Sequence, residues 1–118
     1  HTIIPGMLAE GERAVMPFGV MGGHYQATGH AHFLTNFIDF AMDPQEALDA
    51  PRAFHYEDEL TVENGVSPAT RAKLSELGHP VEAAELPLGG GQAILIDWQR
   101  GSLTGASDPR KDGCALGY

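Results

Sequence analysis

The sequence lacks the features that mark several classes of protein. Its 118 residues include a single cysteine, Cys114, which excludes an internal disulfide and gives no indication of redox compartment. No apolar run is long enough to cross a bilayer. Bases are scarce: 7 lysine and arginine residues stand against 16 acids, and the net charge of −9 argues against nucleic acid and anionic membranes as partners.

What is present predicts a folded domain. Hydrophobic residues make up 42% of the chain, and a single domain over residues 1–118 can bury a core. The chain opens on His1 and runs at once into the strand-like Thr2-Ile3-Ile4. From this opening we expect a piece of a longer polypeptide. The compartment, cytoplasmic or periplasmic and in a bacterial setting, is not readable from these residues.

Strands and helices are expected to alternate. Hydrophobic periodicity and turn residues predict extended segments at 2–9, 13–19, 52–56, 60–62, 81–84, 92–98 and 102–106. Helices are expected at 24–42, 44–51 and 68–78, and residues 89–91 are expected to form a flexible connection. This order indicates an α+β fold in which helices cover one face of an antiparallel sheet and leave the other face bare.

Two helices carry local signals. Asp43-Pro44-Gln45-Glu46 has the pattern of an N-cap, a proline at the first helical position and a capping acid, and Ser67-Pro68 is a second such start. Apolar residues at helical spacing predict which side chains point inward. They are Ala27, Ala31, Leu34, Ile38 and Ala41 with Phe33, Phe37 and Phe40 in the first helix, and Leu74 and Leu77 in the last.

The run 17–23 ends in the glycine pair Gly22-Gly23, directly before the first predicted helix. Unhindered amides at a helix N-terminus, where the macrodipole is positive, can bind an anion or a transient oxyanion. A plain tight turn, in which glycine supplies a positive φ, is the alternative. The residues alone do not choose between the two.

Several blocks together resemble the gamma-glutamyltranspeptidase family. They are Pro17 to Gly23, Asn36 to Phe40, Pro44 to Arg52, Leu60 to Glu63, the glycine-rich segment before Gln92, Gly105 to Arg110, and Gly117-Tyr118. Their order and spacing are similar to those of the C-terminal part of the family's small subunit. The resemblance covers nearly the whole chain.

The resemblance implies an N-terminal nucleophile hydrolase with a four-layer αββα sandwich, of which this chain would hold only some layers. Family members cut themselves in two, and the new N-terminal threonine attacks a gamma-glutamyl amide. Glutathione and its conjugates are typical substrates, and related members accept acyl cephalosporins. The implied partners are the large subunit and the rest of the small subunit, with no metal or organic cofactor.

The same resemblance assigns roles to four residues. Gly22 and Gly23 match the glycine pair of the family's oxyanion hole, although Met21 stands where proline is common. His1 and Thr2 match two adjacent serines that bind the substrate's alpha-carboxylate; the histidine departs from the pattern, and a simple strand start is the alternative. The catalytic threonine would lie upstream of His1, because Thr2 is second in the chain and has no free amine of its own.

Other candidate residues are weaker. His30 and His32 are two apart on a helix and so face different ways, and His55 and His79 lack partners at metal spacing. His24 lies near the glycine pair but has the position of a surface residue. We expect Cys114 to be buried or idle. Structural roles are expected for Arg52 and for Asp108 with Arg110, the latter two as a turn and ion pair.

A second class of function stays open at this point. The chain could be a stand-alone binding or structural module that has kept the fold without the chemistry. Such a module would need its own complete core, or self-association to cover the bare sheet face.

Overall fold

The computed structural model describes residues 2–118, and His1 lies outside the described residues. The chain forms two compact units. The first runs to Asp49 and continues over Gly89–Tyr118; the second is Ala50–Leu88.

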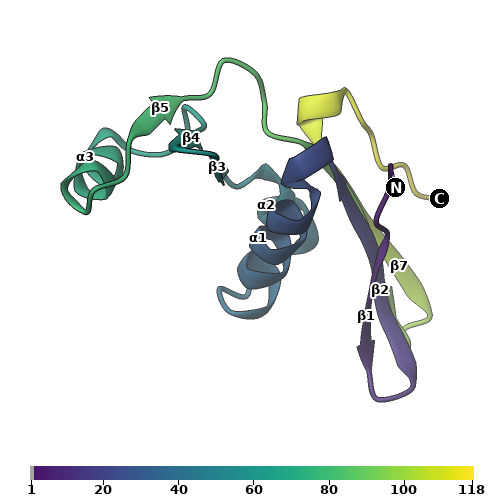
Figure 1. Ribbon diagram of the computed structural model, residues 1–118. Helices are drawn as coiled ribbons and strands as arrows, with labels where there is room; N and C mark the ends of the chain where they lie inside the picture. Colours follow the sequence, from purple (N-terminus) through teal and green to yellow (C-terminus); the bar gives the residue numbers. More distant parts are fainter. Residues whose placement is uncertain (1) are drawn as a thin grey trace. The chain divides into compact units, whose positions relative to one another are not determined.

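The first unit is built on a four-stranded antiparallel sheet (Figure 1). Its strands are β1 (Gly6–Glu10), β2 (Arg13–Met21), β6 (Gly90–Asp97) and β7 (Ser102–Ser107), in the order β1-β2-β6-β7. Two hairpins close on glycines with positive φ, Gly11 at 60° and Gly101 at 64°. The antiparallel sheet and both predicted hairpins are confirmed.

Helices α1 (Gln26–Ile38) and α2 (Pro44–Asp49) lie on one side of this sheet (Figure 1). The ring of Phe33 packs on Phe18 of β2 with 5.5 Å between centroids. A methyl group added to Gly29 would lie 2.6 Å from Val20, so this glycine lets α1 approach β2 closely. Short 3-10 helices, η1 (Gly23–Tyr25) and η2 (Pro109–Lys111), precede α1 and follow β7.

The inward face of α1 differs from the one predicted. The buried residues are Gln26, Gly29, Phe33 and Asn36. Exposed members of the predicted set are Ala27, Ala31, Ile38, Phe40 and Ala41. The last two lie beyond Ile38, where α1 ends, although the sequence predicts a helix as far as residue 42. The polar residues can be buried because backbone groups of other segments satisfy them, as the Nδ2 of Asn36 does by donating to the Ala47 carbonyl at 3.4 Å.

The start of α2 is confirmed in detail. The Oδ1 of Asp43 accepts from the amides of Gln45 and Glu46, at 2.8 and 2.9 Å, and the Oε2 of Glu46 accepts from the Asp43 amide at 3.1 Å. This reciprocal pair satisfies amides that have no partner within the helix.

The second unit holds a three-stranded sheet and one helix. β3 (Ala53–Tyr56) pairs antiparallel with β4 (Glu59–Val62), and β4 pairs parallel with β5 (Val81–Ala83). α3 (Pro68–Glu76) begins at Ser67, whose Oγ accepts from the Thr70 amide at 3.1 Å. Leu74 is half-buried, but Leu77 is 71% exposed, so the prediction that Leu77 points inward is wrong.

Neither α1 nor α2 lies on the other face of the four-stranded sheet. The C-terminal segment reaches one end of that face, where a methyl group at Gly90 would meet Lys111 and one at Gly105 would lie 3.1 Å from Ala115. The register places Met7, Pro17 and Ile94 in one row across this face, opposite to Phe18 and Ala93. Leu103 lies on the same face through its pairing with Ile96. Met7, Ile94 and Leu103 are 58%, 45% and 68% exposed. We call the surface of these five residues, Met7, Pro17, Ile94, Ile96 and Leu103, the open face.

The segment 89–91 is ordered, contrary to the predicted flexible connection. Gly90 and Gly91 are the first residues of β6 and are buried. The Gly91 amide donates to the Oδ2 of Asp108 at 2.8 Å, which fixes this end of the strand. Within residues 2–118, no helix is both long enough and apolar enough to span a membrane.

Candidate functional site

The predicted anion site is the turn Gly22-Gly23, between the end of β2 and the start of η1. Gly22 has φ 140° and Gly23 has φ 59°, a range that favours glycine. The Gly22 carbonyl accepts from the Tyr25 amide at 3.1 Å. A chain with side chains at these two positions could adopt this turn only with strain.

The amides of this turn are available to a ligand. Among residues 2–118, the N–H groups of Gly22 and Gly23 donate to no protein acceptor. A methyl group at Gly23 would meet no atom within 4 Å, whereas one at Gly22 would lie 2.9 Å from the Cα of Gly89. Gly22 is therefore packed against the chain behind it, and Gly23 faces open space.

Gln26 connects this turn to the segment before β1. Its side chain is only 5% exposed; Oε1 accepts from the Ile4 amide at 3.3 Å, and Nε2 donates to the Gly23 carbonyl at 3.2 Å. No role is predicted for Gln26 from the sequence, because a polar residue does not belong to the apolar stripe of the helix. Its position three residues after Gly23 is the one sequence feature that could have indicated a contact with the turn.

The two predicted carboxylate-binding positions lie at the start of the chain. His1 is outside the described residues. Thr2 is exposed and precedes the first strand, because β1 begins at Gly6 and residues 2–5 are not part of the sheet. The prediction of a strand from Thr2 is therefore wrong, and the Ile4–Gln26 hydrogen bond holds this segment beside the start of α1.

Asp108 and Arg110 form the predicted turn and ion pair, with 3.2 Å between Arg110 Nη1 and Asp108 Oδ1. Asp108 is fully buried. Arg110 also donates to the carbonyls of Leu48 at 2.8 Å and Asp49 at 3.4 Å, the last residues of α2. The pair joins β6, β7 and α2. In the second unit, Arg52 is 2% exposed and donates to the Leu88 carbonyl at 2.7 Å.

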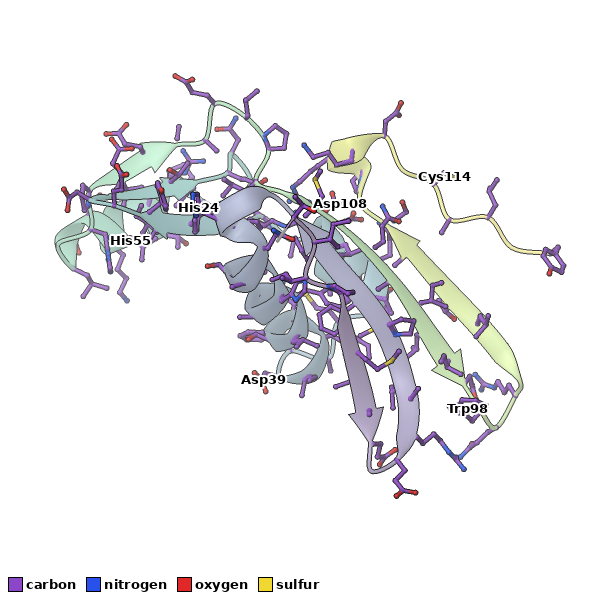
Figure 2. All side chains as sticks on the ribbon, turned by 45° about the vertical axis from the view of Figure 1, so that its right-hand side comes forward. His24, Asp39, His55, Trp98, Asp108 and Cys114 are labelled. Atoms are coloured by element: carbon purple, nitrogen blue, oxygen red, sulfur yellow. The ribbon has the colours of Figure 1, made fainter. Side chains whose placement is uncertain are left out.

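The remaining candidates do not assemble into a metal or nucleophile site. Among the residues that the structure describes, no three His, Cys, Asp or Glu side chains form a metal-binding group. The rings of His55 and His79 do approach, with 6.4 Å between centroids, which the spacing had not indicated. His24 is exposed at η1 (Figure 2). Cys114 is exposed, contrary to the alternative of a buried thiol.

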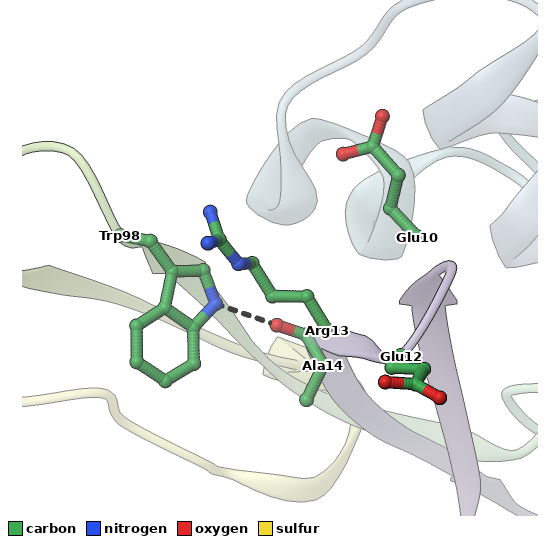
Figure 3. Close-up of a pocket in the computed structure, with 5 residues that line it drawn as sticks. All are labelled: Glu10, Glu12, Arg13, Ala14 and Trp98. Carbon is green, nitrogen blue, oxygen red and sulfur yellow. Dashed lines mark hydrogen bonds between the residues drawn. The ribbon is translucent and has the colours of Figure 1, made fainter.

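A separate depression of about 690 Å³ lies at the hairpin ends of the sheet (Figure 3). It is lined by Glu10, Glu12, Arg13, Ala14 and Trp98. The guanidinium of Arg13 lies 5.9 Å from the centre of the Trp98 ring, and the indole Nε1 donates to the Ala14 carbonyl at 2.7 Å. The nine residues of β2 separate this depression from the glycine turn, so it lies at the opposite end of the sheet.

The family model for gamma-glutamyltranspeptidase matches residues 1–118. The chain belongs to the gamma-glutamyltranspeptidase family. It is 34% identical to the glutathione hydrolase-like YwrD proenzyme of Bacillus subtilis, over 99% of this chain and 24% of that protein. It is 35% identical to the oxamate amidohydrolase proenzyme of Klebsiella pneumoniae, over 100% of this chain and 24% of that protein.

Solved structures of the family have the same fold. The cephalosporin acylase of Bacillus halodurans superposes with a TM-score of 0.87 at 40% identity, covering 93% of this chain and 21% of that one. The predicted α+β fold of the N-terminal nucleophile hydrolases, represented here by some of its layers, is thereby confirmed. The chain spans about a quarter of the length of the curated family members named above.

Proposed function

We propose that this chain supplies the oxyanion hole and part of the acyl-group pocket of an enzyme that hydrolyses or transfers gamma-glutamyl or related acyl groups. The observation that carries the proposal is the glycine turn. Gly22 and Gly23 both have positive φ, their amides have no acceptor among residues 2–118, and Gly23 faces open space at a helix start.

The chemistry follows from what such amides can do. When a nucleophile attacks an amide carbonyl, the carbonyl oxygen becomes negatively charged in the tetrahedral intermediate. Preorganised N–H donors that reach this oxygen stabilise it more than they stabilise the ground state. The attacking group would be an N-terminal threonine outside this chain, with its own amine as the base.

Thr2, together with His1, is proposed to bind the carboxylate of the acyl group. The Thr2 side chain is exposed and offers a hydroxyl donor. The named family members differ in substrate: one name specifies glutathione, one oxamate and one a cephalosporin. We therefore assign the reaction class, acyl transfer from an amide to water or to an acceptor amine, and leave the acyl group open.

The open face supports a further polypeptide as partner. Met7, Ile94 and Leu103 form an exposed apolar surface, of the kind that marks protein–protein contact. A groove of about 260 Å³, whose lining includes Pro17 and Ile94, runs over this face. We propose that the rest of the small subunit and the large subunit cover it. A stand-alone module would instead cover it with a second copy.

The test replaces one of two equivalent glycines in the full-length protein that contains this chain. Gly23 and Gly11 have φ 59° and 60°, and a side chain at either would meet no atom within 4 Å. Gly23→Val and Gly11→Val therefore impose the same local backbone strain, about 30 Å apart along β2. We expect kcat for a gamma-glutamyl anilide to fall by about 10² or more in Gly23→Val only.

Equal activity of the two variants would reduce the pair to an ordinary turn and refute the proposal. A second assay uses the chain of residues 1–118 by itself, which we expect to show no turnover and no acyl-enzyme by mass spectrometry. A covalent acyl adduct on the chain alone would show that the nucleophile lies within it.

A further inference from the structure

Gln26 makes two hydrogen bonds that join separate parts of the proposed site. Its Oε1 accepts from the Ile4 amide and its Nε2 donates to the Gly23 carbonyl, and the residue is buried. These partners leave one orientation of the amide, because a backbone N–H needs an acceptor and a carbonyl needs a donor. Both ends of the side chain are therefore committed.

At the turn, hydrogen bonds fix the backbone torsion angles of Gly23, a residue with no side chain to restrict them. The peptide plane that carries the Gly23 N–H also carries the Gly22 carbonyl, which accepts from the Tyr25 amide at 3.1 Å. The next peptide plane carries the Gly23 carbonyl, which accepts from both the backbone N–H and the Nε2 of Gln26. The two planes on either side of Gly23 are thus fixed, and with them the direction of its N–H.

At its other end, Gln26 reaches the segment that bears Thr2. Ile4 follows Thr2 by two residues, so their Cα atoms are at most about 7 Å apart. Residues 2–5 lie outside the sheet, and the amide of Ile4 is held by Gln26. The same side chain therefore positions the proposed carboxylate-binding hydroxyl and the proposed oxyanion donors.

We propose that Gln26 is a positioning residue that sets the distance between the carboxylate end and the reacting end of the acyl pocket. This inference rests on the proposed function. Gln26 itself touches neither the reacting atoms nor the substrate; it acts through the Gly23 carbonyl and the Ile4 amide.

Two substitutions in the full-length protein test the role. In Gln26→Glu, an ionised carboxylate can still accept from Ile4 but presents no hydrogen to the Gly23 carbonyl. Protonation restores one donor and one acceptor, and burial beside a carbonyl raises the pKa of the introduced carboxyl. We expect kcat, relative to wild type at the same pH, to be about tenfold or more lower at pH 8 and to recover toward pH 5.5.

Gln26→Met has a similar length and no hydrogen bonds, so its loss should not recover at low pH. Asn36→Asp is the matched control, because Asn36 is a buried amide on the same helix that donates to Ala47 and has no link to the turn. Its relative kcat should not rise at low pH. Hydrogen exchange of the segment containing Ile4 should be faster in Gln26→Met than in wild type, independently of activity.

The inference is overturned if Gln26→Glu keeps wild-type kcat and KM from pH 5.5 to 8, or if Asn36→Asp shows the same recovery. Neither outcome depends on the Gln26→Met variant folding. Failure of the proposed function would look different: Gly23→Val would then match Gly11→Val. Loss in Gly23→Val without loss in Gln26→Glu would remove the positioning role alone.

Discussion

At the scale of single residues, the pKa of His30 depends on burial by a few neighbours, which the sequence does not reveal. Its ring meets Phe18 edge-on with 5.1 Å between centroids, and its Nε2 is buried without a hydrogen-bond partner among residues 2–118. Desolvation by burial lowers the pKa of His30 below its ordinary value of 6.5. The spacing of His30 and His32 does not suit a metal pair, and the lowered pKa of His30 results from its burial beside Phe18.

This burial makes a prediction for acid stability. Above pH 6.5 both the folded and the unfolded chain carry a neutral His30, and its stabilising effect is complete. As the pH falls below 6.5, the unfolded chain takes up a proton that the folded chain resists, so the free energy of unfolding decreases. His30→Phe should reduce this loss between pH 7 and 5, measured by urea unfolding. His24→Phe, at an exposed site, should keep the wild-type slope; equal slopes in all three proteins would contradict the argument.

Gly89 is a second residue whose role depends on the space around it, because there is no room for a side chain at this position. It has φ 65°, and a methyl group there would meet the Met21 carbonyl oxygen and lie 2.7 Å from the Tyr25 ring. Gly101 has φ 64° but no atom within 4 Å of such a methyl group. Both alanine variants carry the cost of a positive φ, and Gly89→Ala should lose about 1–3 kcal/mol more in unfolding free energy. Equal losses would show that the close approach behind Gly22 is unimportant.

At the scale of elements, local sequence patterns predict the helix starts and the hairpin turns. Contacts between residues distant in sequence determine the buried face of α1 and the strand pairing. The caps at Asp43 and Ser67 and the turn at Gly11 involve neighbours in sequence, and all three are confirmed. The prediction of the inward face of α1 is wrong because Gln26 and Asn36 are buried there, each with a backbone hydrogen-bond partner distant in sequence.

Non-local pairing also explains two other differences. Gly90 and Gly91 belong to β6 because β2 pairs with them and Asp108 holds the Gly91 amide. The parallel pairing of β4 with β5 joins strands that are separated by α3, and no pattern of residues in either strand indicates it.

Among the contacts between elements, we expect those of Asp108 to contribute most to the free energy of unfolding. Its carboxylate accepts from the Gly91 amide, the Arg110 amide and the Arg110 guanidinium, and the side chain has no exposure. Asp108→Asn keeps the shape but removes the charge beside Arg110, and should cost roughly 3–5 kcal/mol in unfolding free energy. Asp97→Asn is the control, because its 3.6 Å pair with Arg100 is exposed. A comparable small loss in both, by chemical denaturation, would contradict this assignment.

At the scale of the whole molecule, the exposed apolar residues of the open face support the proposal that further polypeptide covers the sheet. The order of elements predicts a sheet face without helices, and Met7, Ile94 and Leu103 are exposed on that face of the first unit. In the full-length protein, Leu103→Glu would bury a charge if this face is covered, and should lower the Tm by several degrees. Thr104→Glu lies next to it on the opposite face and should change the Tm little. Two equal, small changes would show that the open face stays in water.

The oxyanion role itself is best tested by a crystal structure of the full-length protein with a trapped tetrahedral or acyl adduct. We expect the oxygen derived from the substrate carbonyl to lie about 2.7–3.1 Å from the backbone nitrogens of Gly22 and Gly23. An adduct oxygen bound by other donors, with both glycine amides turned to protein carbonyls, would contradict the proposed role of this chain.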